Sequence, residues 1–109
     1  MAAPPQDRAR QNRLLRALTP PTLAQLLPAL EPVRLDMKEI LAAPNVPIRF
    51  VYFPLTGLVS LISTLADGTI VEVATIGHEG LVGLPLFLRA ASMPLTAIVQ
   101  VPGEALHGR

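Results

Sequence analysis

The side chains that could carry chemistry in this sequence are few and scattered. His78 and Glu79 are adjacent, but neighbouring side chains on an extended segment point to opposite faces and could not act together on one substrate. The other histidine, His107, lies near the end of the sequence. Two histidines without a defined carboxylate partner make a poor metal site. We therefore expect neither acid–base catalysis nor a bound metal.

The hydroxyl groups and glycines give no enzyme signature either. The serines lack a nucleophile elbow and a nearby histidine; they are Ser60, Ser63 and Ser92. Glycine recurs every third residue from Gly77 to Gly83, without the lysine or the strand-to-helix context of a phosphate-binding loop. The absence of cysteine excludes disulfides and thiolate ligands and is compatible with a cytoplasmic location. We expect that the chain is not an enzyme.

Arginines near the N-terminus could contact nucleic-acid phosphates; they are Arg8, Arg10, Arg13 and Arg16. No aromatic side chain lies between them to stack on bases, and the net charge of the chain is only +1. A solvated helix face explains them better, so we expect no DNA-binding residues here.

The bulk composition predicts one folded domain. Half of the 109 residues are hydrophobic and 16% are charged, which suits a globular chain with a single core. The longest uncharged stretch, residues 50–66, contains Pro54 and Gly57 and is shorter than the roughly 20 residues of a membrane-spanning helix. Paired buried strands explain it better, so we expect no membrane segment.

Two short helices are expected at the start of the ordered chain. Residues 1–11 show no periodic apolar pattern, and we expect a disordered tail there. Order begins near Asn12, followed by a stripe of leucines. Thr19-Pro20 reads as an N-cap with proline at the first helical position, and Pro28 should bend or end the second helix.

From Glu31 onward the pattern becomes that of short β-strands separated by turns. The clearest unit is a hairpin, in which residues 58–65 and 69–76 flank Asp67-Gly68, because this dipeptide favours a two-residue turn with positive φ. Glu72 should face solvent or a barrel mouth. Another strand is expected over 96–101. Many short strands of this kind predict a mainly β sandwich or barrel.

Several segments occur in the order found in one known family: Asn12-Arg13-Leu14-Leu15, Leu26-Leu27-Pro28, Glu31-Pro32-Val33, Lys38-Glu39-Ile40-Leu41, Val51-Tyr52-Phe53-Pro54, Gly57-Leu58-Val59-Ser60-Leu61 and Gly77-His78-Glu79-Gly80-Leu81-Val82-Gly83-Leu84. Together they resemble the N-terminal domain of the Crp/Fnr transcription regulators over residues 12–106. The resemblance implies a jelly-roll (double-stranded β-helix) barrel of the cyclic nucleotide-binding type with short N-terminal helices. It also implies a signal-sensing role in transcription regulation.

In that family a cyclic nucleotide contacts a cassette with the pattern Gly-Glu-Leu and, further on, Arg-Ser or Arg-Thr. When Leu86-Phe87 is aligned with the cassette helix, Gly83 takes the place of the glutamate and Met93-Pro94 that of the arginine and serine. A buried phosphodiester needs a charge-assisted donor such as guanidinium. The resemblance therefore implies a degenerate cassette to which cyclic AMP does not bind, and no cofactor is expected.

The residues expected to line this degenerate ligand pocket are Gly83, Leu84, Met93, Pro94 and Thr96. The nearest residues of the right chemistry, Glu79 and Arg89, lie several positions off the pattern, so a shifted loop would be needed to use them. Solvated loop charges are the simpler explanation of both.

Full-length family members continue past the barrel with a dimerisation helix and a helix-turn-helix that docks in the major groove. Here the sequence ends with His107-Gly108-Arg109, so we expect a barrel domain over 12–109 that is truncated at its C-terminal end. DNA would be bound only through a missing C-terminal domain, and a homodimer would form only with the downstream helix. A free-standing module for an unknown small-molecule effector and a non-functional truncated product remain alternatives.

Overall fold

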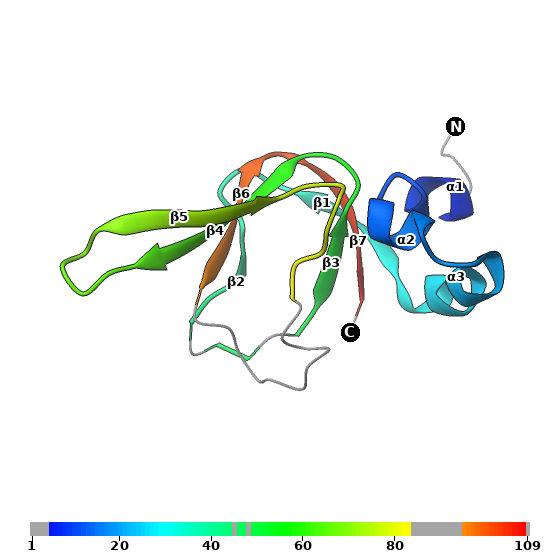
Figure 1. Ribbon diagram of the computed structural model, residues 1–109, viewed down its shortest axis with the longest axis horizontal. Helices are drawn as coiled ribbons and strands as arrows, with labels where there is room; N and C mark the ends of the chain where they lie inside the picture. The colour runs from blue at the N-terminus through cyan, green and yellow to red at the C-terminus, as the bar shows by residue number, and fades with distance from the viewer. Residues whose placement is uncertain (1–4, 45, 48, 84–94, 109) are drawn as a thin grey trace.

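A computed structural model describes residues 5–44, 46, 47, 49–83 and 95–108 of the chain. Short helical segments come first and strands follow (Figure 1). The helices are α1 (Pro5–Ala9), α2 (Arg13–Arg16), α3 (Pro20–Leu26) and a 3₁₀ turn, η1 (Leu27–Ala29). The strands are β1 (Glu31–Leu35), β2 (Ile40–Ala42), β3 (Val51–Pro54), β4 (Leu58–Thr64), β5 (Ile70–Ile76), β6 (Thr96–Val101) and β7 (Gly103–Gly108). The expected mainly β fold is confirmed.

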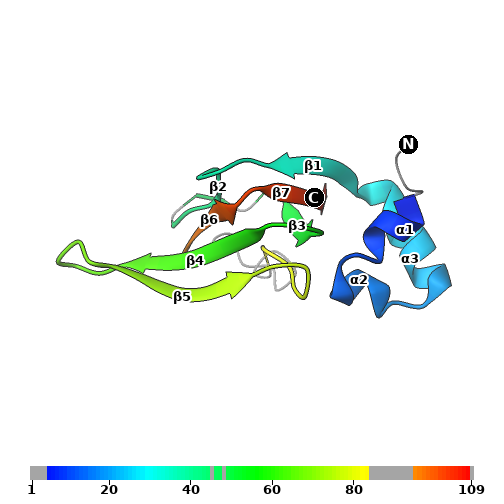
Figure 2. The same cartoon turned by 90° about the horizontal axis from the view of Figure 1, so that it is seen from above.

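The strands form two antiparallel sheets. One has the order β1-β7-β3 and the other the order β2-β6-β4-β5, and Figure 2 shows them from above. Consecutive strands repeatedly lie in different sheets: β1 and β2, β3 and β4, and β6 and β7 are each divided between them. This alternation is the connectivity of a jelly roll, in which two sheets enclose one core.

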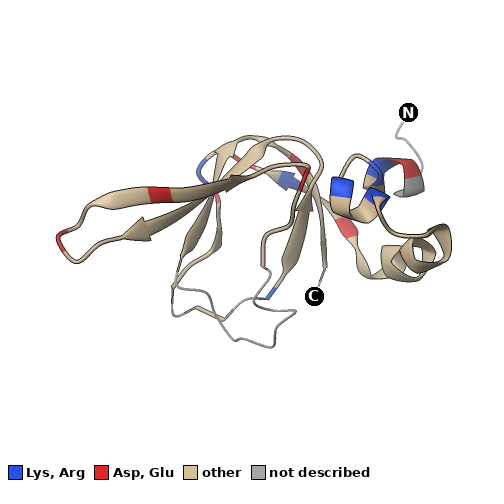
Figure 3. Ribbon diagram, in the orientation of Figure 1, with Lys and Arg blue, Asp and Glu red and all other residues tan. Residues whose placement is uncertain are grey.

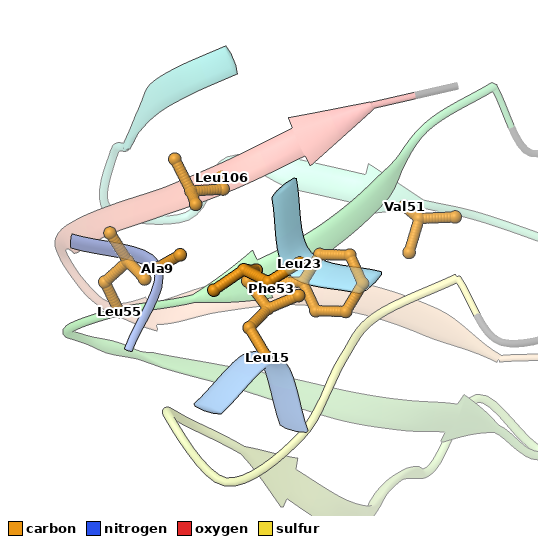
Figure 4. Close-up of a cluster of buried hydrophobic side chains, with 7 residues drawn as sticks. All are labelled: Ala9, Leu15, Leu23, Val51, Phe53, Leu55 and Leu106. Atoms are coloured by element: carbon orange, nitrogen blue, oxygen red, sulfur yellow. The ribbon is translucent and has the colours of Figure 1, made fainter. Parts of the chain in front are cut away.

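Both faces of the three-stranded sheet are covered, which explains why every residue of β3 is buried. Strand residues alternate between faces. Phe53 and its cross-strand partner Leu106 pack against the helices, whereas Tyr52 faces the space between the two sheets. The cluster beneath the helices (Figure 4) consists of Ala9, Leu15, Leu23, Val51, Phe53, Leu55 and Leu106.

Asn12 fastens the helices to the barrel. Its side chain is fully buried, and its Oδ1 accepts from the backbone N–H groups of Leu14 (3.0 Å) and Leu15 (3.2 Å) at the start of α2. Its Nδ2 donates to the carbonyl oxygens of Pro54 and Gly80, each at 2.8 Å. One polar side chain thus caps a helix and joins it to the end of β3 and to the turn that contains Gly80.

The N-terminal segment differs from the expected disordered tail. Residues 5–9 form α1, and Ala9 is completely buried in the cluster beneath the helices. Arg8 forms an ion pair with Glu104 of β7. The buried Ala9 and the ion pair of Arg8 with Glu104 attach α1 to the rest of the domain. Neither contact produces a periodic apolar pattern in the sequence.

The second expected helix is confirmed. Thr19 is the N-cap of α3 and Pro20 its first residue, and Pro28 lies in the 3₁₀ turn that follows. The Thr19 side chain makes no capping hydrogen bond to the backbone and instead shares a 2.8 Å hydrogen bond with the hydroxyl of Thr22. Among the described residues, no helix is both long and apolar enough to cross a membrane.

The hairpin between β4 and β5 is confirmed, but its expected two-residue turn is wrong. Leu65 accepts from the N–H of Gly68 and donates its own N–H to the carbonyl of Thr69, which leaves three residues in the loop. Gly68 has a φ of +87°, whereas Asp67 lies outside the positive-φ region and its Oδ1 accepts from the Thr69 N–H at 2.9 Å. This is a type I turn followed by a glycine bulge, which needs only one positive φ.

The strand that follows β6 was not expected from the sequence. β7 pairs with β1 on one side and β3 on the other, so it is the central strand of its sheet. Its middle residues, Ala105 and Leu106, are both buried, and they face opposite sides of the sheet. A strand buried on both faces shows no alternation of apolar and polar residues, which is why the pattern did not reveal it.

Candidate effector-binding site

The space between the two sheets is apolar. Its buried residues come from both sheets and from the segment after β5: Leu35, Tyr52, Val59, Val82, Ala97, Val99 and Ala105. Burial raises the pKa of the Tyr52 phenol, and the negative charge of Glu39 raises it further. The phenol is therefore neutral at physiological pH, so Tyr52 supplies an uncharged polar group to this interior.

The described residues on either side of the expected cassette are attached to different sheets. Val82 forms an isolated bridge with Tyr52 of β3, with N–H to carbonyl hydrogen bonds of 2.8 and 2.9 Å in both directions. At the other end, Thr96 is the first residue of β6 and pairs with Ile62 of β4. Val82 is therefore attached to the three-stranded sheet, and Thr96 belongs to the four-stranded sheet.

Of the five expected pocket residues, the structure describes Gly83 and Thr96; Leu84, Met93 and Pro94 lie outside the described residues, as does Arg89. Gly83 is buried and has a φ of +101°, a conformation that side chains with a Cβ rarely adopt. Thr96 is half-buried at the start of β6.

Glu79 is already used within its own turn. Its Oε1 accepts from the backbone N–H of Gly77 at 3.0 Å, and this hydrogen bond is the main cause of its lowered pKa. The N–H of Gly80 closes the turn on the Gly77 carbonyl at 3.2 Å. Residues 77–80 thus form a hydrogen-bonded turn, which differs from the extended segment expected for His78 and Glu79.

A second polar group lies on β4, β5 and β6. The hydroxyl of Ser60, itself only 5% exposed, donates to Glu72 at 2.7 Å and makes a short contact with the side-chain amide of Gln100. A hydroxyl has one proton to donate, so at any one time Ser60 donates either to the Glu72 carboxylate or to Oε1 of Gln100. The neighbours of Ser60 along β4, Val59 and Leu61, face the interior, so this group faces away from it. Glu72 is exposed, as expected.

No protein-family model matches the sequence, and no curated protein matches it. Solved structures do match. The N-terminal domain of a transcriptional regulator from Streptomyces coelicolor aligns with a TM-score of 0.77 and 25% identity, over 93% of this chain and 71% of that one.

Two regulatory subunits of a cAMP-independent protein kinase A also match. A mutant of the Trypanosoma brucei subunit bound to cAMP has a TM-score of 0.81 and 18% identity, over 94% of this chain. The Trypanosoma cruzi subunit bound to guanosine has a TM-score of 0.76 and 17% identity, over 95% of this chain. This chain spans only 38% and 40% of the length of these subunits. The likenesses establish the fold as the jelly roll of cyclic nucleotide-binding domains.

Proposed function

We propose that this chain is the sensory domain of a Crp/Fnr-type transcription regulator and that its effector is not cyclic AMP. The observation that carries the proposal is that the described residues flanking the expected cassette, Val82 and Thr96, pair with strands of the barrel. The sequence between them offers Met93-Pro94 in place of the arginine and serine. The domain would act in the cytoplasm by regulating a partner domain rather than by catalysis.

The backbone of Gly83 improves the alignment of the cassette. A φ of +101° suits the glycine of the Gly-Glu-Leu pattern and not its glutamate. Gly83 is then the glycine of the pattern, and Leu84, the next residue, takes the place of the glutamate. The conclusion for recognition is unchanged, because leucine cannot accept a hydrogen bond from a ribose hydroxyl.

The proposed effector is a small uncharged molecule. None of the buried residues that the structure describes is charged, and moving a charged phosphodiester into this interior without a charged partner would be very costly. The T. cruzi subunit, which has this fold, is described with guanosine, a nucleoside without a phosphate. A protein that contains this fold therefore binds an uncharged ligand.

Calorimetry with cyclic AMP tests this proposal. We expect no binding of micromolar affinity or tighter, and such binding by the wild-type chain would contradict the proposal. The double variant Leu84→Glu with Met93→Arg should gain measurable affinity, because it restores both the carboxylate and the guanidinium. A threonine-to-arginine change is among the substitutions in the T. brucei mutant bound to cAMP.

The matched control is Gly83→Glu with Met93→Arg, which introduces the same groups with the glutamate one position earlier. We expect it to bind no better than the wild type, because glutamate at a φ of +101° is strained. If this control gained affinity and the Leu84→Glu variant did not, the alignment based on Gly83 would be wrong.

DNA recognition would require a helix-turn-helix segment beyond this sequence, and a homodimer would require the helix that precedes it. We therefore expect no sequence-selective gel shift from the 109-residue chain itself. A promoter-selective shift at physiological salt would contradict this part of the proposal.

A further inference from the structure

A cavity of about 440 Å³ lies beside the last residues of β7 and is lined by Ala29, Glu31, Phe50, His107 and Gly108. Its volume falls in the range of small-molecule sites in proteins. Neither Gly83 nor Thr96 is among these lining residues, so the cavity is separate from the described ends of the cassette. The cassette proposal does not account for it.

Strand register explains why the functional side chains meet here. His107 of β7 pairs with Glu31 of β1 and with Tyr52 of β3, and directly paired residues project from the same face of a sheet. The imidazole of His107 stacks on the ring of Phe50, with centroids 4.7 Å apart and an angle of 23°. The Tyr52 ring lies 5.5 Å from the imidazole. The rings of Phe50, Tyr52 and His107 thus lie together on the face of the sheet from which Glu31 also projects.

The imidazole still has hydrogen-bonding capacity. Its Nδ1 is buried and has no hydrogen-bond partner among the described residues, although buried polar atoms in native proteins are nearly always paired. A rotation of the ring toward a ligand would therefore break no hydrogen bond at this atom. His107 can offer a ligand one polar contact next to an aromatic surface.

The charge of the cavity selects the ligand. Glu31 is the only charged residue among the described residues that line the cavity, and it is exposed. Within the described part of the chain, the ion pairs are Arg8–Glu104 and Arg34–Asp36, so Glu31 is not neutralised by either. A carboxylate beside aromatic rings attracts a cation, which interacts favourably with the ring faces as well. The same carboxylate repels a phosphate or carboxylate ligand.

We propose that this cavity binds a small aromatic amine in its protonated form, with the ammonium group at Glu31 and the aromatic body against Phe50 and His107. The proposal is independent of the cassette, since it uses none of the expected pocket residues.

The amino-acid composition provides a specific reporter. The chain contains one tyrosine and no tryptophan, so tyrosine fluorescence reports on Tyr52 alone, beside the cavity. Titration with 2-phenylethylamine should change this fluorescence saturably. 3-Phenylpropionate, which has a similar shape and the opposite charge, should bind at least about tenfold more weakly. No saturable change with the amine, or equal binding of the acid, would overturn the proposal.

Glu31→Gln keeps the shape of the side chain and removes its charge. We expect it to weaken 2-phenylethylamine binding by about tenfold. Asp7→Asn, at an exposed position of α1 outside the cavity, removes the same charge and should leave the affinity unchanged. Melting curves of both variants establish that each is folded. Equal affinities of the two folded variants would show that Glu31 does not bind the amine and would overturn the proposal.

Discussion

At the scale of single residues, Asn12 joins the helices to the barrel through four hydrogen bonds of its buried side chain. Its amide has two donor hydrogens and two acceptor lone pairs, and the structure uses all of them, on Leu14, Leu15, Pro54 and Gly80. Thr19 holds the corresponding N-cap position of α3 but makes no capping hydrogen bond. The two caps therefore look alike in sequence and differ in what they stabilise.

Asn12→Ala should lower the free energy of unfolding by about 2–4 kcal/mol, because it leaves two carbonyls and two N–H groups without their partner in a buried setting. Thr19→Ala should cost only a few tenths of a kcal/mol, since no backbone hydrogen bond is lost. Urea denaturation of both variants measures the difference. Equal losses would mean that the hydrogen bonds of Asn12 are not the source of its effect.

Glu79 gives a prediction about pH. Its hydrogen bond with Gly77 holds its pKa below the usual 4.5, so its stabilising contribution is present above the pKa of the unfolded chain. That contribution is lost as pH falls through the lower pKa of the folded chain. Wild type should therefore melt at a higher temperature than Glu79→Gln at pH 7, and the two midpoints should converge as the pH is lowered through the pKa of Glu79 in the folded chain. A gap in melting temperature that does not change with pH would contradict this role.

At the scale of elements, two glycines with positive φ allow the effect of backbone strain to be distinguished from that of a steric clash. Gly68 in the hairpin loop has a φ of +87° and open space around it, whereas Gly57 has a φ of +81° and a Cβ there would lie 2.5 Å from the carbonyl oxygen of Val101. Conformational strain acts at both positions, but a steric clash acts at one.

Gly68→Val should cost about 1–3 kcal/mol, since a β-branched residue resists positive φ. Gly68→Asn should cost less, because asparagine tolerates this region. Gly57→Ala should destabilise more than Gly68→Ala, and thermal melts of this pair test the argument directly. An unchanged midpoint for Gly68→Val would point to a different turn.

The sequence patterns predicted the elements whose formation depends on neighbouring residues. Thr19-Pro20 gave the start of α3, and the alternation around Asp67-Gly68 gave the hairpin. The position of α1, by contrast, depends on the packing of Ala9 and on the partner of Arg8 in β7. Such contacts between distant segments leave no periodic signal in the sequence.

The candidate sites show the same difference between features that depend on neighbouring residues and features that depend on contacts between distant segments. The order of the segments predicts a cassette after Gly80, but the positive φ of Gly83 appears only in the structure. The cavity at His107 could not be foreseen at all. Glu31, Phe50 and His107 come from distant parts of the chain, and the antiparallel register of β1, β7 and β3 brings them together.

At the scale of the whole molecule, the described part is elongated, with extents of 48 × 29 × 18 Å, and the β4–β5 hairpin projects from one end (Figure 1). β5 is an edge strand, and Ile70 and Val73 on it are 63% and 57% exposed. The hairpin carries only Asp67 and Glu72 as charged residues, and Figure 3 shows the long uncharged stretches around them. An exposed apolar edge strand favours association between chains.

We therefore expect light scattering from the purified chain to rise with concentration. Ile70→Lys should reduce this association, because a charge at an edge strand opposes pairing. Met37→Lys adds the same charge at a position that is 56% exposed and lies outside the hairpin, and it should have little effect. Scattering from the wild type that corresponds to a monomer at all concentrations would contradict the expectation.

The central position of β7 has a consequence for biosynthesis. β1 emerges early from the ribosome and β3 soon after, but both pair only with β7 in their sheet, and β7 follows every other strand in the sequence. Pairing β1 with β7 closes a loop that includes most of the chain, which is entropically costly and slow. The β4–β5 hairpin, whose pairing is local, can form while translation continues. Vectorial synthesis thus leaves β1 and β3 as unpaired strands that a chaperone could bind until β7 has been made.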